Sequence, residues 1–231
     1  MNHWIIKSPN PVECDVLNES LQFPSRNIYC VGRNYKDHTE EMGGDPKKEK
    51  PFFFQKTSDI LVKNGSELIY PKDTSNLQYE VELVVAISKD AFKVGSREAR
   101  NKVFGYAVGV DITKRDLQKI SKNSGKPWFS AKVFYSSAMI SDIVSVEDSY
   151  DPGDIKISLE INGERKQFTS CNKMIWNAFE LISILSQTIP LKAGDLIFTG
   201  TPSGVGQLQK GDVVEAKLIQ NNSTSLSFVV K

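Results

Sequence analysis

The chain has 231 residues, with 29 lysines and arginines against 28 aspartates and glutamates. This balance gives no support to a nucleic-acid or membrane-surface role, because such partners select a strongly basic face. Three cysteines are too few and too scattered for a disulfide framework or a zinc site, which favours a reducing compartment. The length is typical of one domain with a substantial core.

Residues 1–26 are predicted to form an irregular segment that packs on the main body. Pro9, Pro11 and Pro24 interrupt its short apolar stretches. The first residues lack the apolar core of a secretory signal and the arginine-rich helix of an organelle presequence, and no apolar run could span a membrane. We therefore expect a single domain over residues 27–231 and a cytoplasmic location.

The next elements bring a histidine and a glutamate together. Residues 28–32 (IYCVG) are predicted to form a buried strand, with Gly32 allowing a sharp turn into a short helix over residues 37–42. On that helix His38 and Glu41 lie three positions apart and share a face. A carboxylate that orients an imidazole and favours its charged form is suited to general acid–base chemistry. A surface ion pair is the alternative.

A charged loop and a second strand follow this helix. Residues 45–50 have the composition of a mobile lid as well as of an ordinary loop. Residues 52–56 (FFFQK) are predicted to form another buried strand. The sequence leaves open whether Lys56, at the end of that strand, reaches the surface or points into a site.

Residues 77–88 (LQYEVELVVAIS) are predicted to form one strand, because β-branched residues crowd a stretch without glycine or proline. Since strand side chains alternate, Glu80 and Glu82 project from the same face as Gln78. Two carboxylates on an apolar strand repel each other unless a positive group, most simply a cation, lies between them. A half-exposed sheet with an acidic outer face is the alternative.

Further candidate residues follow along the chain. Ser96 is predicted to cap a helix that runs to residue 103, and residues 105–113 are predicted to form a strand that carries Asp111 at its end. Asp111 is either the cap of the next helix or a third carboxylate beside the two glutamates. On that helix Arg115 and Gln118 share a face. Lys132 lies in an apolar stretch, where burial requires an acidic partner or an anionic ligand.

The C-terminal third is predicted to be a β-rich body with one long helix. Residues 155–161 and 164–169 form a hairpin around the Asn162-Gly163 turn, and residues 174–187 form a helix with an apolar core stripe. Residues 191–206 read as a turn, a buried strand and a glycine-rich loop whose amides, near Gly204, approach a small ligand; no nucleotide fingerprint matches. Strands over residues 213–218 and 225–230 close the body.

Six motifs in this order together resemble the fumarylacetoacetate hydrolase family. They are CVGRNYKDHTEEM, LQYEVELVV, GYAVGVDITKRDLQ, KPWFSAKVF, the ING-E turn and LKAGDLIFTGTPSGVG. The similarity covers residues 26–231 and is closest to the short single-domain members, of the acylpyruvase and oxaloacetate decarboxylase type. Longer members have a separate N-terminal domain and a fourth metal carboxylate without a counterpart here, so fumarylacetoacetate itself is not expected as the substrate.

The resemblance implies an α+β, β-rich mixed β-sandwich roll, usually a homodimer, that forms one catalytic domain. It implies a divalent cation bound by Glu80, Glu82 and Asp111. Hard carboxylate oxygens favour Mg²⁺ or Mn²⁺ over Ca²⁺ and disfavour zinc. The resemblance also implies further site residues around a bound ligand: a catalytic His38–Glu41 pair on a lid helix, a catalytic Lys132, and the substrate-binding residues Arg33, Arg115, Gln118 and Thr201.

The function implied is metal-dependent cleavage of a C–C bond in small 2-oxo acids. An acylpyruvate would be hydrolysed to pyruvate and a carboxylate, and oxaloacetate would be decarboxylated, both through a metal-stabilised enolate. Alternatives within the family are keto–enol tautomerisation of oxaloacetate and isomerisation or decarboxylation of a 2-oxo acid in aromatic degradation. An alternative of another class is a non-catalytic, metal-dependent dicarboxylate-binding protein.

Overall fold

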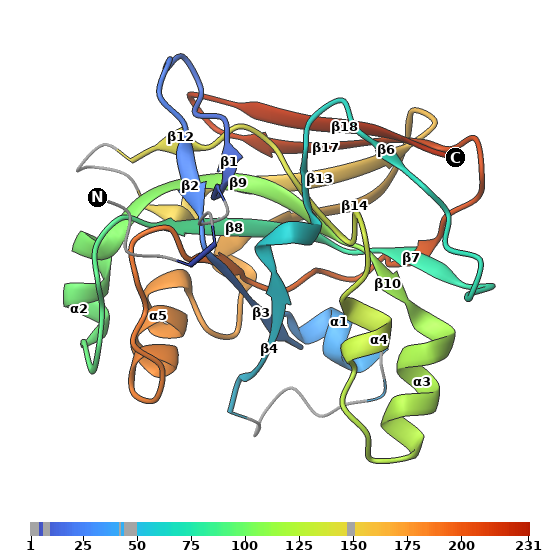
Figure 1. The fold of residues 1–231 in the computed structure, drawn as a ribbon, viewed down its shortest axis with the longest axis horizontal. Coiled ribbons are helices and arrows are strands. Elements are labelled where there is room, and N and C mark those ends of the chain that lie inside the picture. The colour runs from blue at the N-terminus through green and yellow to red at the C-terminus, as the bar shows by residue number, and fades with distance from the viewer. Residues whose placement is uncertain (1–4, 7–9, 42, 44–49, 147–150) are drawn as a thin grey trace.

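The computed structural model describes residues 5–6, 10–41, 43, 50–146 and 151–231. Two sheets face each other, and short helices lie around them (Figure 1). The larger sheet is mixed and has the strand order β4 (Phe52–Thr57), β3 (Asn27–Gly32), β15 (Leu196–Phe198), β8 (Val81–Ile87), β9 (Val103–Asp111), β11 (Ala138–Ile140) and β5 (Leu61–Lys63), with β12 (Val144–Ser145) paired to β9. This arrangement confirms the predicted β-rich α+β class.

The remaining strands form one large and two small sheets. The second large sheet has the order β14 (Glu164–Ser170), β13 (Lys156–Ile161), β17 (Val213–Ile219), β18 (Thr224–Val230) and β6 (Glu67–Leu68). A three-stranded sheet contains β10 (Thr113–Lys114), β7 (Leu77–Tyr79) and β16 (Gly206–Gln207), and a two-stranded one contains β1 (Val12–Cys14) and β2 (Phe23–Ser25). The last pair is a hairpin within the N-terminal segment that the prolines led us to expect as irregular.

The described residues form five short α-helices: α1 (Lys36–Glu41), α2 (Ser96–Ala99), α3 (Arg115–Asn123), α4 (Phe129–Lys132) and α5 (Ala178–Ser186). They also form four 3-10 helices: η1 (Ser58–Ile60), η2 (Arg100–Lys102), η3 (Pro152–Asp154) and η4 (Cys171–Lys173). Helices α1, α3 and α4 gather beside β4, whereas α2 and α5 lie together at the other end (Figure 1). Among the described helices, none combines the length and the apolar character that crossing a membrane requires.

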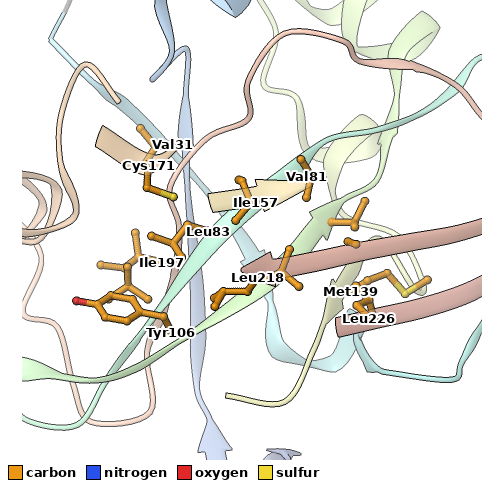
Figure 2. Packing of buried hydrophobic residues seen from close by; sticks show 14 of the residues in the cluster. Val31, Val81, Leu83, Tyr106, Met139, Ile157, Cys171, Ile197, Leu218 and Leu226 are labelled. Atoms are coloured by element: carbon orange, nitrogen blue, oxygen red, sulfur yellow. The ribbon is translucent and has the colours of Figure 1, made fainter. Parts of the chain in front are cut away.

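The main core lies between the two large sheets. Leu83 on β8, Ile157 on β13 and Leu218 on β17 point toward one another, and all three are fully buried (Figure 2). The opposite face of β8 packs Val84 and Ala86 against a second apolar cluster. Every residue of β8 is buried, so the alternative of a half-exposed sheet with an acidic outer face is wrong.

The predicted strand over residues 77–88 is interrupted at Glu80. Residues 77–79 pair within the three-stranded sheet, whereas Val81 begins the pairing with β9 in the larger sheet. The backbone N–H of Val81 donates to the side chain of Gln167 at 2.9 Å instead of to a strand. Glu80 therefore lies at the joint between two sheets, which the local sequence does not signal.

Some predicted boundaries and roles are wrong for identifiable reasons. The turn after β3 is made by Arg33, with a φ of 59°, whereas a Cβ on Gly32 would lie 2.0 Å from the Phe52 ring. Strand β4 is only partly buried, apart from Lys56. Helix α2 starts after a Gly95 cap, so Ser96 is not its cap, and it gives way to η2 after Ala99.

Helix α5 starts four residues later than predicted. The chain before it is held by Asn34, whose backbone carbonyl accepts the N–H of Ile175 at 2.8 Å and whose side-chain oxygen accepts that of Trp176 at 2.8 Å. Asn177 then caps α5 with a capping box. The hairpin is confirmed, with φ of 52° and 80° at Asn162 and Gly163. The predicted lid over residues 45–50 lies outside the described residues, except for residue 50.

Candidate active site

Three carboxylates from two neighbouring strands meet at one buried point. Glu80 comes from the joint before β8, Glu82 from β8 and Asp111 from the end of β9, and the backbone N–H of Asp111 donates to the Glu80 carbonyl at 2.9 Å. One ligand oxygen from each residue lies within 4.8 Å of the others. Asp111 does not cap α3, since the cap position is Lys114 and no side chain bonds there. Asp111 is therefore the third carboxylate beside Glu80 and Glu82, as one of the two alternatives predicted.

Basic side chains surround this cluster. Lys132 Nζ lies 2.7 Å from Glu80 Oε2 and 2.7 Å from Asp111 Oδ2, and the Arg115 guanidinium donates to Glu80 Oε1. Lys56, whose direction the sequence left open, is fully buried with its Nζ 2.9 Å from Asp111 Oδ1. Glu80 and Asp111 are thus the acidic partners that the buried Lys132 requires.

Charge compensation is uneven within the cluster. Burial raises the pKa of the Glu80 carboxyl, but the charges of Lys132 and Arg115 outweigh burial and hold that pKa well below its usual range. Burial, with the neighbouring charges of Asp111 and Glu80, raises the pKa of Glu82 well above its usual value. Glu82 Oε2 accepts one bond, from the Gly200 N–H at 2.7 Å. Glu82 is therefore the carboxylate that most lacks a positive partner.

The donor set fits a hard divalent cation. All three ligand residues are buried and offer only carboxylate oxygens, which Mg²⁺ and Mn²⁺ prefer. Asp111 Oδ1 is in ion-pair contact with Lys56 but accepts no hydrogen bond, so it keeps acceptor capacity in a buried place. A divalent cation here would offset the repulsion between Glu82 and its two neighbours.

The histidine–glutamate pair forms as the helical spacing predicts. His38 Nδ1 lies 3.1 Å from Glu41 Oε2; His38 is buried whereas Glu41 is exposed, so the pair links the interior to the surface. Glu41 Oε1 also accepts the backbone N–H of Gly204 at 3.3 Å. The glycine-rich loop therefore donates its amides at Gly200 and Gly204 to protein carboxylates, and the approach of the Gly204–Gly206 region to a small ligand stays a prediction.

Arg115 and Gln118 interact directly on one face of α3. Arg115 Nη1 donates to Gln118 Oε1 at 2.6 Å, and its Nε donates to Gln78 Oε1 at 2.7 Å. The side-chain hydroxyl of Thr201 accepts a bond from Gln167 Nε2 at 2.9 Å. These contacts hold the guanidinium and the Thr201 loop in place at the edge of the carboxylate cluster.

One cavity of ≈ 50 Å³ connects these groups. Its lining includes every candidate site residue from the sequence except Glu41 and Asp111. The candidates that line it are Arg33, His38, Glu80, Glu82, Arg115, Gln118, Lys132 and Thr201. The lining also contains Phe52, Phe54, Trp128 and Lys122, which the sequence did not single out. Trp128 lies within the KPWFSAKVF motif, but aromatic and lysine side chains are ordinary on strands and exposed helices, so neither the motif nor the spacing assigned a role to these four residues.

Gln167 was also missed, although it holds two parts of the site together. It is 1% exposed, its Oε1 accepts the Val81 N–H, and its Nε2 donates to Thr201 Oγ1 and to the Pro202 carbonyl at 2.9 Å. Its only sequence signal is a polar residue at an inward position of the hairpin strand β14.

Comparisons with known proteins point to one family. Residues 27–228 match the family described as fumarylacetoacetate (FAA) hydrolase C-terminal. A mitochondrial oxaloacetate tautomerase of Caenorhabditis elegans is 40% identical over 188 residues, which cover 81% of this chain and 87% of the relative. A fumarylpyruvate hydrolase of Ralstonia sp is 42% identical over 171 residues, covering 74% and 88%.

A solved structure has the same fold over its whole length. The crystal structure of a fumarylpyruvate hydrolase from Pseudomonas aeruginosa in complex with Mn²⁺ and pyruvate has a TM-score of 0.92 and 39% sequence identity, and the match covers 100% of both chains. The extent of the family match, the identity of these relatives and the shared fold lead to one conclusion: the chain belongs to the fumarylacetoacetate hydrolase family.

Proposed function

We propose that this enzyme hydrolyses acylpyruvates to pyruvate and a carboxylate, with Mg²⁺ as its cation and Mn²⁺ as an effective substitute. The observation that carries the proposal is one cavity lined by both His38 and the glutamates of a buried carboxylate cluster. The Ralstonia relative and the Pseudomonas structure, both named as fumarylpyruvate hydrolases, support the same reaction.

A cation held by Glu80, Glu82 and Asp111 would polarise the 2-oxo acid and stabilise developing enolate charge. The remaining steps belong to side chains. His38, held through Nδ1 by Glu41, accepts a proton from water through its other ring nitrogen as that water attacks the distal carbonyl carbon. The C–C bond then breaks, its electron pair leaves with the pyruvate enolate, and the enolate carbon takes up a proton.

Lys132 and Arg115 have a complementary role. Both place positive charge in direct contact with an acidic cluster that would otherwise repel an anionic substrate. Gln118 and Thr201, which line the same cavity, supply neutral hydrogen-bonding groups, and Arg33 supplies a further cation. The homodimeric state and the cytoplasmic location stay predictions.

A second candidate is decarboxylation or tautomerisation of oxaloacetate. The 40% identical relative named as an oxaloacetate tautomerase favours it. In this reaction the electrons come from the departing carboxylate or from a C–H bond, so no attacking water is needed. The same carboxylate cluster would hold the cation for this reaction, and His38 would not need to activate water.

The deciding experiment is a substrate panel of acetylpyruvate, fumarylpyruvate and oxaloacetate. Each is assayed with EDTA, with Mg²⁺ and with Mn²⁺, following pyruvate release and enol absorbance. We expect pyruvate release from the acylpyruvates that EDTA abolishes and either metal restores. Enol loss confined to oxaloacetate would favour the second candidate, and metal-dependent binding without any turnover would identify a dicarboxylate-binding protein instead.

A further inference from the structure

Helix α3 lines the cavity with three polar side chains in a row. Arg115, Gln118 and Lys122 are spaced i, i+3 and i+7, which places them on one face of a helix. Because an α-helix rises 1.5 Å per residue, the Lys122 backbone lies about 10 Å further along the axis than that of Arg115. The row therefore runs outward from the carboxylate cluster to the rim of the cavity.

The two ends of this row, Arg115 and Lys122, differ in the hydrogen bonds and ion pairs that they make within the protein. Arg115 donates to Glu80, Gln78 and Gln118, so its hydrogen bonds are used within the protein. Lys122 is exposed at the rim and, within the described part of the chain, its ammonium makes no hydrogen bond or ion pair. Lys122 thus offers the cavity a positive charge that no described acidic side chain neutralises.

Three aromatic side chains line the same cavity as this row. The Trp128 ring packs edge-on against Phe52, with ring centroids 5.3 Å apart and an interplanar angle of 84°. Phe54 packs on Trp128 at 6.1 Å. All three side chains line the cavity. Such rings favour contact with a flat, conjugated chain over a compact polar one.

We propose that Lys122 binds a carboxylate at the far end of the acyl group and so selects long acylpyruvates that carry a second acid. The proposal rests on the proposed function, because it takes the 2-oxo acid end to lie at the carboxylate cluster. Six C–C bonds separate the two carboxylates of fumarylpyruvate, about 7 to 8 Å when extended. Oxaloacetate has three such bonds, about 4 Å, and ends near Gln118 instead.

Three substrates then respond differently to the loss of Lys122. In the Mg²⁺-loaded enzyme, Lys122→Met should raise KM for fumarylpyruvate roughly fivefold and leave kcat unchanged. A roughly fivefold change corresponds to the strongest interaction expected of an exposed ion pair. Acetylpyruvate has no second carboxylate and oxaloacetate is too short, so their KM values should change less than about twofold. Lys122→Arg keeps the charge and should restore most of the loss.

Lys119→Met is the matched control. Lys119 is exposed on the same helix and carries the same charge but does not line the cavity. An equal rise in KM with this variant would mean that the overall charge of α3, and not contact with Lys122, attracts the substrate. That outcome, or an unchanged KM for fumarylpyruvate in Lys122→Met, would overturn the proposal.

A binding measurement separates this proposal from the proposed function. Calorimetry with Mg²⁺ compares 2-oxopimelate, whose two carboxylates are six C–C bonds apart as in fumarylpyruvate, with 2-oxoheptanoate, which ends in a methyl group. The wild type should prefer 2-oxopimelate roughly fivefold, and Lys122→Met should remove that preference. If the preference is found but no acylpyruvate is turned over, the proposed function fails while the role of Lys122 stands. No preference in the wild type would overturn that role.

Discussion

Gln167 Oε1 accepts the backbone N–H of Val81 at 2.9 Å, between the two glutamates of the acidic cluster. The same amide donates to Thr201 and to the Pro202 carbonyl, so one buried side chain ties the interrupted strand to the glycine-rich loop. Gln167 therefore acts as a positioning residue for Glu80 and Glu82.

Replacing Gln167 by methionine should weaken cation binding while the protein stays folded. The change leaves the Val81 N–H without a partner, a cost of about 1–3 kcal/mol, and frees the joint that carries Glu80. We expect about tenfold weaker Mn²⁺ binding, by analogy with outer partners of metal ligands, measured by calorimetry. Gln209→Ala, at an exposed position, is the control. Unchanged Mn²⁺ affinity in Gln167→Met would show that the joint is held without this side chain.

Two isosteric substitutions in the cluster should have opposite effects on metal-free stability. Glu80 is paired with Lys132 and Arg115, so Glu80→Gln leaves Arg115 without its carboxylate and Lys132 with Asp111 alone, and should cost about 3–5 kcal/mol of unfolding free energy. Glu82 lacks a basic partner, so Glu82→Gln relieves repulsion and should leave stability unchanged or raised. Urea unfolding in EDTA measures both. Both variants should lose the stabilisation that Mg²⁺ gives to the wild type, and its retention in Glu82→Gln would refute the site assignment.

Lys56 should contribute to stability because it is buried with Asp111. Its Nζ also donates to the Ser137 carbonyl at 2.9 Å. Lys56→Met removes these bonds and should lower the free energy of unfolding by about 3–5 kcal/mol. The control is Lys63→Met, since Lys63 and Asp15 are 40% and 43% exposed and such a pair is worth about 1 kcal/mol at most. Equal losses of unfolding free energy in the two variants would show that the buried Lys56–Asp111 pair contributes no more to stability than the exposed Lys63–Asp15 pair.

His38→Ala should separate the two candidate reactions. Without its general base, acylpyruvate hydrolysis should fall by about 10²- to 10⁴-fold in kcat, whereas oxaloacetate decarboxylation, which needs no water activation, should fall much less. Pyruvate release measures both rates. Glu41→Gln should show a smaller loss because the imidazole remains. An equal loss of both reactions in His38→Ala would instead indicate a role in binding or closure.

The three cysteines should react only when the protein unfolds. Burial raises the pKa of the Cys14 and Cys171 thiols, each to about 12, and raises that of Cys30 well above its usual value. Since the thiolate is the reactive form, a disulfide reagent at about pH 8 finds almost none in the folded protein. We expect no labelling in native buffer and labelling of all three in guanidinium chloride. Rapid native labelling would contradict the burial of these thiols.

Local periodicity was sufficient to predict which side chains of one element share a face. The alternation along the predicted strand over residues 77–88 predicted that Glu80 and Glu82 project together, and the helical spacing predicted the pairs His38–Glu41 and Arg115–Gln118. These relationships follow from bond geometry over a few residues, so the sequence by itself determines them. The resemblance of six motifs then predicted that Asp111 and Lys132 belong to the same site as these residues.

Only the tertiary structure decided the contacts that join distant segments. The interruption at Glu80 depends on pairing with β10 and β16 and on Gln167, which is 86 residues from Val81. The burial of Lys56 depends on Asp111, and the rim position of Lys122 depends on how α3 packs beside β7. Such contacts form where strands and helices from separate parts of the chain pack. Their free energies depend on burial and mutual distance, which no local spacing of residues specifies.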